Sequence, residues 1–197
     1  MNSKWAIKVD KDGFSHKEAK YLFSEVAHLF CSEKVTKTKL NVLITIGIAS
    51  SFSIRVTFRN GHKIEILLDE QGIFWGSNKD LSNEITELKK AVSEIYQATF
   101  AQRLEPFESE IAGKGFFTYD ECRFYPNTKI VFRDKEFFLN NLSFRNYGFA
   151  IELMPKNMSL MDKIIRANYP FKTPQFNTQT DHDVISHLLL KYFRIKI

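Results

Sequence analysis

Two segments in which apolar and polar residues alternate, joined by Asn60-Gly61, most constrain the fold of the first half of this chain. Apolar and polar side chains alternate in residues 52–58 and again in residues 62–69, which places the apolar ones on one face of a strand. Asn-Gly between two such runs is a strong β-hairpin signal, because both residues tolerate the positive φ of a two-residue turn. The sequence therefore predicts an antiparallel sheet with one buried face.

A first helix is expected between a short initial strand, residues 5–9, and this hairpin. Ser15 and Glu18 have the spacing of a capping box, and apolar residues follow at intervals of three and four positions up to Phe30. The basic and polar residues 33–39 are expected to form a loop, and an apolar strand is expected to follow them.

A longer helix is expected after the sheet. Its apolar stripe continues to Phe100, and Pro106 is expected to end it, because proline lacks the N–H that an internal helical residue donates. Residues 105–115 contain this proline and two glycines, and they are predicted to form a linker. The predicted domains are accordingly residues 1–112 and residues 113–197.

The second half is expected to repeat this plan, without a repeat of individual residues. The predicted fold class is α+β: two antiparallel β-meander units, each covered by a C-terminal helix, packed as one two-lobed protein. Strands grouped in this way argue against a parallel nucleotide-binding sheet. The expected segments are strands at 116–124, 129–133, 136–140 and 147–154, a short helix after residue 157 or 159, and a final helix from residue 180.

The composition excludes several classes of protein. The 197 residues carry a net charge of +5, spread nearly evenly over both halves, and they include two cysteines, Cys31 and Cys122, far apart in the sequence. Neither a disulfide framework nor a CxxC motif is therefore expected. The longest apolar stretch, residues 42–49, is much shorter than the roughly 20 residues that span a bilayer. The first residues lack the apolar run of a signal peptide, and we expect a cytoplasmic protein.

No linear catalytic motif is present, and we expect no cofactor and favour a role that is not enzymatic. The one cluster with metal-ligand chemistry is Asp181-His182-Asp183, followed by His187. Asp183 and His187 are four residues apart and would share a helix face, so a metal-dependent enzyme is one alternative. We favour a helix N-terminus, because Thr180, Asp181 and Asp183 suit capping and the helix dipole.

Basic and aromatic residues are interleaved between residues 123 and 145. Such a segment can bind nucleic acid or an anionic surface, but a sheet with phenylalanine inside and lysine or arginine outside gives the same pattern. The pairs Phe116-Phe117 and Phe137-Phe138 must place one ring on each face of a strand, so an exposed ring would mark a binding surface. The candidate binding surface consists of Arg123, Tyr125, Lys129, Arg133, Lys135, Arg145 and Tyr147.

Residues 145–149, Arg-Asn-Tyr-Gly-Phe, resemble part of the strand motif of RRM domains. In that family the strand aromatics stack on RNA bases. The order of elements expected here differs from that of an RRM, and we expect Tyr147 and Phe149 to lie on a buried face.

The leading hypothesis is a non-catalytic binding protein that acts through protein–protein interaction, as a regulator, an inhibitor or an immunity-type partner. A nucleic-acid or anionic-surface binding module that uses residues 123–145 and residues 34–39 is an alternative. A membrane-surface module of pleckstrin-like architecture is another, since strands closed by a helix are compatible with it. The sequence does not determine the oligomeric state.

Overall fold

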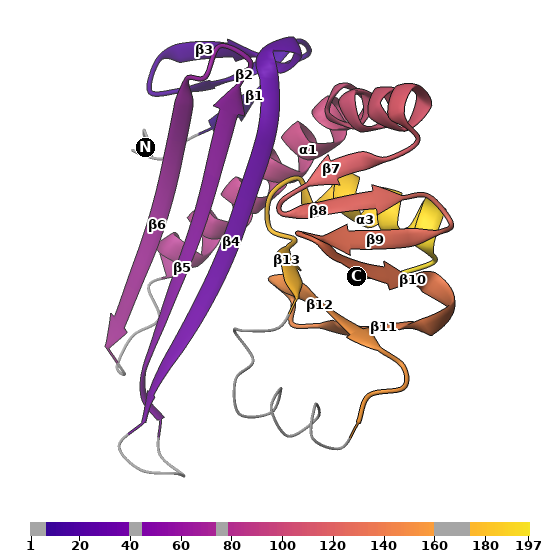
Figure 1. The fold of residues 1–197 in the computed structure, drawn as a ribbon. Helices are drawn as coiled ribbons and strands as arrows, with labels where there is room; N and C mark the ends of the chain where they lie inside the picture. Colours follow the sequence, from indigo (N-terminus) through magenta and orange to yellow (C-terminus); the bar gives the residue numbers. More distant parts are fainter. Residues whose placement is uncertain (1–6, 40–44, 74–78, 160–173) are drawn as a thin grey trace. The chain divides into compact units, whose positions relative to one another are not determined.

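The computed structural model describes residues 7–39, 45–73, 79–159 and 174–197 (Figure 1). Within these ranges it contains four antiparallel sheets of three or four strands and two α-helices, so the predicted α+β class is confirmed. The chain divides into two compact units, Met1–Gln102 and Arg103–Ile197. Among the described residues, no helix is both long and apolar enough to cross a membrane.

The N-terminal unit has two three-stranded sheets in its described part and the first portion of the long helix α1. Each sheet follows the order of the chain, and the apolar faces of the strands meet residues of α1 in one core. Its elements are β1 (Ile7–Val9), β2 (Gly13–His16), β3 (Ala19–Leu22), the 3-10 turn η1 (Phe23–Glu25), β4 (Val26–Lys39), β5 (Thr45–Phe58), β6 (Lys63–Ile73) and α1 (Lys79–Lys114). Its buried core consists of Phe14, Val26, Leu29, Phe52, Ile54, Val56, Phe58, Ile66, Leu88, Val92 and Ile95.

The predicted hairpin between β5 and β6 is confirmed. Strand pairing continues to Thr57 and Lys63 at the turn. Gly61 has φ 83°, and the side-chain oxygen of Asn60 accepts the backbone N–H of His62 at 2.9 Å. Only the glycine of the Asn-Gly pair has a positive φ, so the turn is not the two-residue type that the sequence favours.

The helix predicted for residues 15–30 is wrong. These residues form the β2–β3 hairpin, η1 and the start of β4, and Ser15 pairs with Lys8 on one side and Lys20 on the other. The two turn residues, Lys17 and Glu18, have positive φ of 48° and 67°, and lysine and glutamate are not residue types from which a positive φ is predicted. Pairing across the sheet therefore overrides the local capping signal. The loop predicted at residues 33–39 is also wrong, since β4 continues through it.

Helix α1 continues past Pro106 to Lys114, so the predicted helix end and the predicted linker are both wrong. A proline inside a helix leaves the carbonyl four residues earlier, here that of Gln102, without its helical donor. Contacts beyond the proline hold the helix together, because the Phe107 ring packs edge-on against Phe117 at 5.8 Å. The boundary between the two compact units falls at Gln102, in place of the boundary after residue 112 expected from the sequence.

The C-terminal unit consists of a four-stranded sheet, a three-stranded sheet, the end of α1 and helix α3. In Figure 1, α3 lies behind strands β8 and β9. The Phe193 ring of α3 makes edge contacts with Phe117 and Phe124 on that covered face. Its elements are β7 (Phe117–Tyr119), β8 (Cys122–Tyr125), β9 (Lys129–Phe132), β10 (Lys135–Phe138), η2 (Leu139–Asn141), β11 (Leu142–Asn146), β12 (Ala150–Pro155), β13 (Gln175–Asn177) and α3 (His182–Phe193).

The final helix is confirmed, but several strands of the C-terminal unit differ from the prediction. The strand expected at residues 116–124 is a hairpin, because Asp120 adopts φ 52° and forms a turn with Glu121. These two carboxylates therefore lie in the turn between β7 and β8. Strands β11 and β13 were not anticipated as separate elements. The short helix expected after residue 157 or 159 lies mostly outside the described residues.

The two units share a succession of two strands, a 3-10 turn and a third strand, although their residues show no repeat. Strands β2, β3, η1 and β4 begin at residues 13, 19, 23 and 26, and β9, β10, η2 and β11 begin 116 positions later, at 129, 135, 139 and 142. The backbone N–H of Phe23 donates to Asp12 O at 3.0 Å, and the equivalent Leu139 N–H donates to Thr128 O at 3.1 Å. The last residue of the second strand is a half-exposed apolar residue in both units, Leu22 (51%) and Phe138 (50%).

Candidate binding surface on the C-terminal unit

The two faces of the β7–β10 sheet have different chemistry. Cross-strand partners lie on the same face of a sheet, and neighbours along a strand alternate between faces. Phe124 pairs with Phe117 and Ile130, and Phe137 pairs with Ile130, so these four buried side chains share the inner face that α3 covers. The opposite, outer face therefore carries the alternate residues of each strand.

One row of residues on the outer face forms a ladder across the sheet. Lys129 pairs with Tyr125 on β8 and with Phe138 on β10, and its Nζ atom lies 5.2 Å and 5.6 Å from the two ring centroids. The Tyr125 ring in turn contacts the ring of Phe116, the residue before β7, at a centroid distance of 5.0 Å. We call this row, Phe138–Lys129–Tyr125–Phe116, the aromatic ladder. Phe138 is its most open member, because half of its surface is exposed.

The next row of the outer face carries both signs of charge. It contains Glu136, Val131, Arg123 and Thr118 in order across the four strands. Glu136 accepts a hydrogen bond from Lys129 Nζ at 2.6 Å, which links the two rows. Arg123 is exposed and makes no ion pair with any described residue.

The remaining members of the candidate surface lie elsewhere on the C-terminal unit. Arg133 is in the β9–β10 turn, with φ 51°, and donates to both oxygens of Glu121 at 2.8 Å and 3.2 Å. These bonds, with the charge of Arg133, lower the pKa of Glu121. Lys135 is exposed at the start of β10. The structure thus brings Arg123, Tyr125 and Lys129 together on the outer face of this sheet, with Tyr125 and Lys129 in the ladder and Arg123 in the next row, and places the other four residues elsewhere.

Arg145 and Tyr147 belong to the three-stranded sheet and form a separate group around Glu152. The Tyr147 hydroxyl donates to Glu152 Oε2 at 2.9 Å, and Arg145 Nη1 lies 4.0 Å from the same oxygen. Glu152 is buried on β12, whereas Tyr147 (37%) and Phe149 (49%) are exposed and their rings stack at 6.4 Å. The expectation that these two rings lie on a buried face is wrong, because residues 147–149 form the turn between β11 and β12, where Gly148 has φ 83°.

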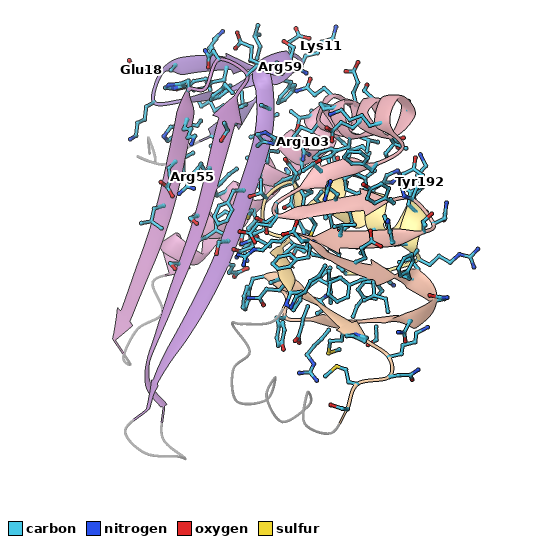
Figure 2. The ribbon with its side chains drawn as sticks, viewed as in Figure 1. Lys11, Glu18, Arg55, Arg59, Arg103 and Tyr192 are labelled. Atoms are coloured by element: carbon cyan, nitrogen blue, oxygen red, sulfur yellow. The ribbon has the colours of Figure 1, made fainter. Side chains whose placement is uncertain are left out.

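The Asp181–Asp183 cluster forms a buried ion pair with Arg103 of α1, which Figure 2 labels. Arg103 Nη1 donates to Asp181 at 3.1 Å and to Asp183 at 2.8 Å, and Nη2 donates to the second Asp183 oxygen at 2.6 Å. Burial by itself lowers the pKa of Arg103, but the hydrogen bonds and charges of Asp183 and Asp181 raise it overall. Asp181 precedes α3 with φ 46°, and its side chain makes no capping bond, so the predicted side-chain cap is wrong at this position.

The hydrogen bonds of Asp183 and His182 determine which atoms of the Asp181–His187 segment could bind a metal ion. Both oxygens of Asp183 are engaged by Arg103, so an ion bound there would compete with the guanidinium group. His182 Nδ1 lies 3.0 Å from the carbonyl oxygen of Thr178. No group of three or more His, Cys, Asp or Glu side chains suited to a metal ion occurs within the described ranges.

Neither cysteine has the features of a nucleophile. Burial is the main cause that raises the pKa of Cys31 to about 11, with a further contribution from the charge of Glu33. Burial also raises the pKa of Cys122, whose side chain is inaccessible in β8. A thiol whose pKa is raised is mostly protonated near neutral pH and therefore reacts slowly.

The sequence indicated part of this surface. The doubled phenylalanines drew attention to Phe116 and Phe138, and the basic residues drew attention to Lys129. Arg103 gave no signal, because its partners lie about 80 positions further along the chain. The chain was also compared with protein-family models, curated proteins and solved structures, and none of them matches it.

Proposed function

We propose that this protein is a non-catalytic binding protein that recognises a protein partner through the aromatic ladder of the β7–β10 sheet. A regulator, an inhibitor or an immunity-type protein would act in this way. The observation that supports the proposal is Phe138, which exposes half of its surface beside Tyr125 and Lys129 on a sheet face that α3 does not cover. Aromatic residues and arginine are enriched at the centres of protein interfaces.

The charges of the same face favour a protein partner over nucleic acid. Phosphate binding draws its energy from cations that replace condensed counterions, so it needs several basic residues without protein partners. Lys129 is paired with Glu136, Arg133 with Glu121, and Arg145 lies near Glu152. Of the predicted basic residues, this leaves Arg123 and Lys135 without an ion pair inside the described ranges. A mixed-charge face with exposed rings is typical of a protein interface rather than a phosphate track.

The proposal is tested by affinity capture from cells of the native host, with the tagged 197-residue chain as bait. Phe138→Ser removes the exposed ring, and Leu22→Ser is the matched control, because it removes an apolar residue of equal exposure at the equivalent place in the N-terminal unit. We expect one protein at near-stoichiometric yield with the wild type and with Leu22→Ser, and its loss with Phe138→Ser.

Two results would contradict the proposal. One is the recovery of the same proteins, in the same amounts, with all three baits. The other is retention of nucleic acid that is released steeply as salt is raised, since that dependence is the signature of phosphate contacts.

A further inference from the structure

We propose that the free edge of strand β6 binds an extended segment of another protein, which adds a strand to the β4–β5–β6 sheet. Within the described ranges, β6 pairs with β5 on one side and is the last strand of its sheet on the other (Figure 1). This edge belongs to the N-terminal unit and does not involve the aromatic ladder. The inference therefore adds a second, independent contact to the proposed function.

Strand β6 differs from the other edge strands in length and regularity. An edge strand exposes a row of backbone N–H and C=O groups, and proteins commonly protect such edges by short strands, bulges, prolines or charges. Strand β4 is long, but its pairing with β5 is irregular near both ends. Strand β6 pairs with β5 over its 11 residues without a register shift, and it contains no proline. The remaining edge strands of the described sheets have three to five residues each, namely β1, β3, β7, β10, β11 and β13.

The hydrogen bonds of the β5–β6 turn show which backbone groups of β6 face the free edge. The Phe58 N–H donates to His62 O at 2.9 Å, so His62 faces β5. Because the two directions alternate along an antiparallel strand, every second residue after His62 also faces β5. The residues between them direct their N–H and C=O groups outward, among them Lys63, Glu65 and Leu67. An extended backbone about 4.8 Å away repeats its own donors and acceptors at the spacing of this row, which identifies the ligand as a peptide strand.

The outer-face side chains of β6 indicate the chemistry of that strand. Leu67 is 48% exposed, and Lys63 is exposed and makes no ion pair within the described part of the chain. Glu65 lies between them but does not guard the edge, because Arg55 of β5 donates to its carboxylate at 3.0 Å. Cross-strand neighbours contact each other on one face of a sheet. The bound segment therefore carries an apolar residue opposite Leu67 and an acidic residue opposite Lys63.

The inner face of β6 adds a further requirement. Ile66 is buried in the core of the N-terminal unit, and the partly buried Ile64 packs against that core. Residues of the added strand that lie beside these two isoleucines extend the apolar surface and are expected to be apolar. In antiparallel order from Leu67 to Lys63, the segment then reads apolar, apolar, any residue, apolar, acidic.

A synthetic probe with this pattern tests the inference. The heptapeptide acetyl-Thr-Val-Val-Thr-Val-Asp-Thr-amide is titrated into the isotope-labelled 197-residue chain and followed by NMR, up to about 5 mM peptide, a range that includes weak binding. We expect chemical-shift changes confined to β6 and its turn. We also expect slower hydrogen exchange at the outward N–H groups of Lys63, Glu65 and Leu67, which pairing with the probe removes from water.

Two N-methylated probes with identical side chains separate backbone pairing from other contacts. Methylation of the second, fourth and sixth residues removes the N–H groups that face β6, and it should weaken binding at least about tenfold. Methylation of the third and fifth residues removes N–H groups that point away, and this matched control should bind like the unmodified probe. On the protein, Glu65→Pro removes one outward N–H that the sheet does not use, and Glu65→Thr retains it. Both variants lose the Arg55 contact, so weaker probe binding by Glu65→Pro alone reports on the backbone, and circular dichroism confirms that both are folded.

The inference would be overturned by the absence of shifts up to the highest probe concentration, or by equal binding of the two N-methylated probes. It would also be overturned if, without probe, exchange at the same N–H groups slowed as the protein concentration rose, because the edge would then be occupied by a second copy of the chain. Phe138→Ser should leave probe binding unchanged. The edge of β6 and the aromatic ladder can therefore fail separately.

Discussion

Replacement of Arg103 by methionine is the most informative perturbation of the C-terminal unit. The arginine side chain has no exposed surface, and it makes three hydrogen bonds to Asp181 and Asp183, whose side chains are 1% and 28% exposed. Arg103→Met keeps much of the side-chain volume but leaves two neighbouring carboxylates, one of them fully buried, without their cation. Removal of one partner from a buried ion pair costs about 3–5 kcal/mol. That is a large part of the roughly 5–15 kcal/mol by which a domain is stable.

The assay has to monitor the unit that contains the ion pair. Both tryptophans of the chain, Trp5 and Trp75, belong to the N-terminal unit, so tryptophan fluorescence would monitor the wrong part of the protein. Amide hydrogen exchange in β8 and β9 reports directly on opening of the C-terminal unit, and β5 serves as the internal reference. We expect protection in β8 and β9 to fall by a factor of roughly 100 or more, since each 1.4 kcal/mol is tenfold in an equilibrium constant.

A second variant separates charge from packing. In the triple variant Arg103→Met, Asp181→Asn and Asp183→Asn, no uncompensated charge remains, so most of the lost protection should return. The reasoning would be refuted if Arg103→Met lowered stability by less than about 1 kcal/mol, the effect of an ordinary exposed ion pair. It would also be refuted if the triple variant were no more stable than the single one.

Three further outcomes follow from other contacts. An alanine at Gly13 would place its Cβ 2.1 Å from the carbonyl oxygen of Tyr21, so strands β2 and β3 would have to move apart. We expect Gly13→Ala to lower the free energy of unfolding by about 1–3 kcal/mol, measured by thermal unfolding. An unchanged melting temperature would contradict this. Burial raises the pKa of Cys31 from 9.0 to about 11, which lowers the fraction of reactive thiolate near pH 8 by about a hundredfold. We therefore expect Cys31 to be alkylated about a hundredfold more slowly in the folded protein than in the unfolded chain, and equal rates would exclude the raised pKa. A hydrogen bond from Lys191 lowers the pKa of Glu108 below its unfolded value of about 4.5. The ionised Glu108 carboxylate therefore stabilises the fold above that unfolded pKa, and this contribution is lost as the pH falls through the lower pKa of the folded state. Glu108→Gln should therefore flatten the acid side of the stability curve, and parallel curves for the two proteins would show that the contact contributes nothing.

Elements that depend on short-range chemistry were predictable from the sequence. The β5–β6 hairpin follows from alternation and a glycine at the turn, and α3 follows from a dense apolar face after Thr180. The predicted helix at residues 15–30 failed because the same apolar residues, among them Val26 and Leu29, are also buried when the segment is extended. Spacing alone does not distinguish the two structures, and pairing with neighbouring strands decides between them.

The candidate binding surface was predictable only in part, for a related reason. Doubled phenylalanines show that a ring must face each side of a strand, but not which ring stays exposed. That depends on α3, whose Phe193 covers the inner face at Phe117 and Phe124. The buried position of Arg103 likewise depends on side chains about 80 residues away, which no local pattern records.

The repeated structure explains why one unit carries the aromatic ladder and the other does not. Gly13 and Lys129 occupy equivalent places, 116 positions apart, each opposite the exposed apolar residue of its hairpin. The backbone of Tyr21 approaches Gly13 so closely that even a Cβ atom does not fit, so no side chain can be placed opposite Leu22 without moving the strands. At Lys129 the same position accepts a long side chain, whose ammonium group lies over the Tyr125 and Phe138 rings. The close backbone contact at Gly13 thus leaves no room for a side chain opposite Leu22, whereas the C-terminal hairpin carries a lysine at the equivalent position.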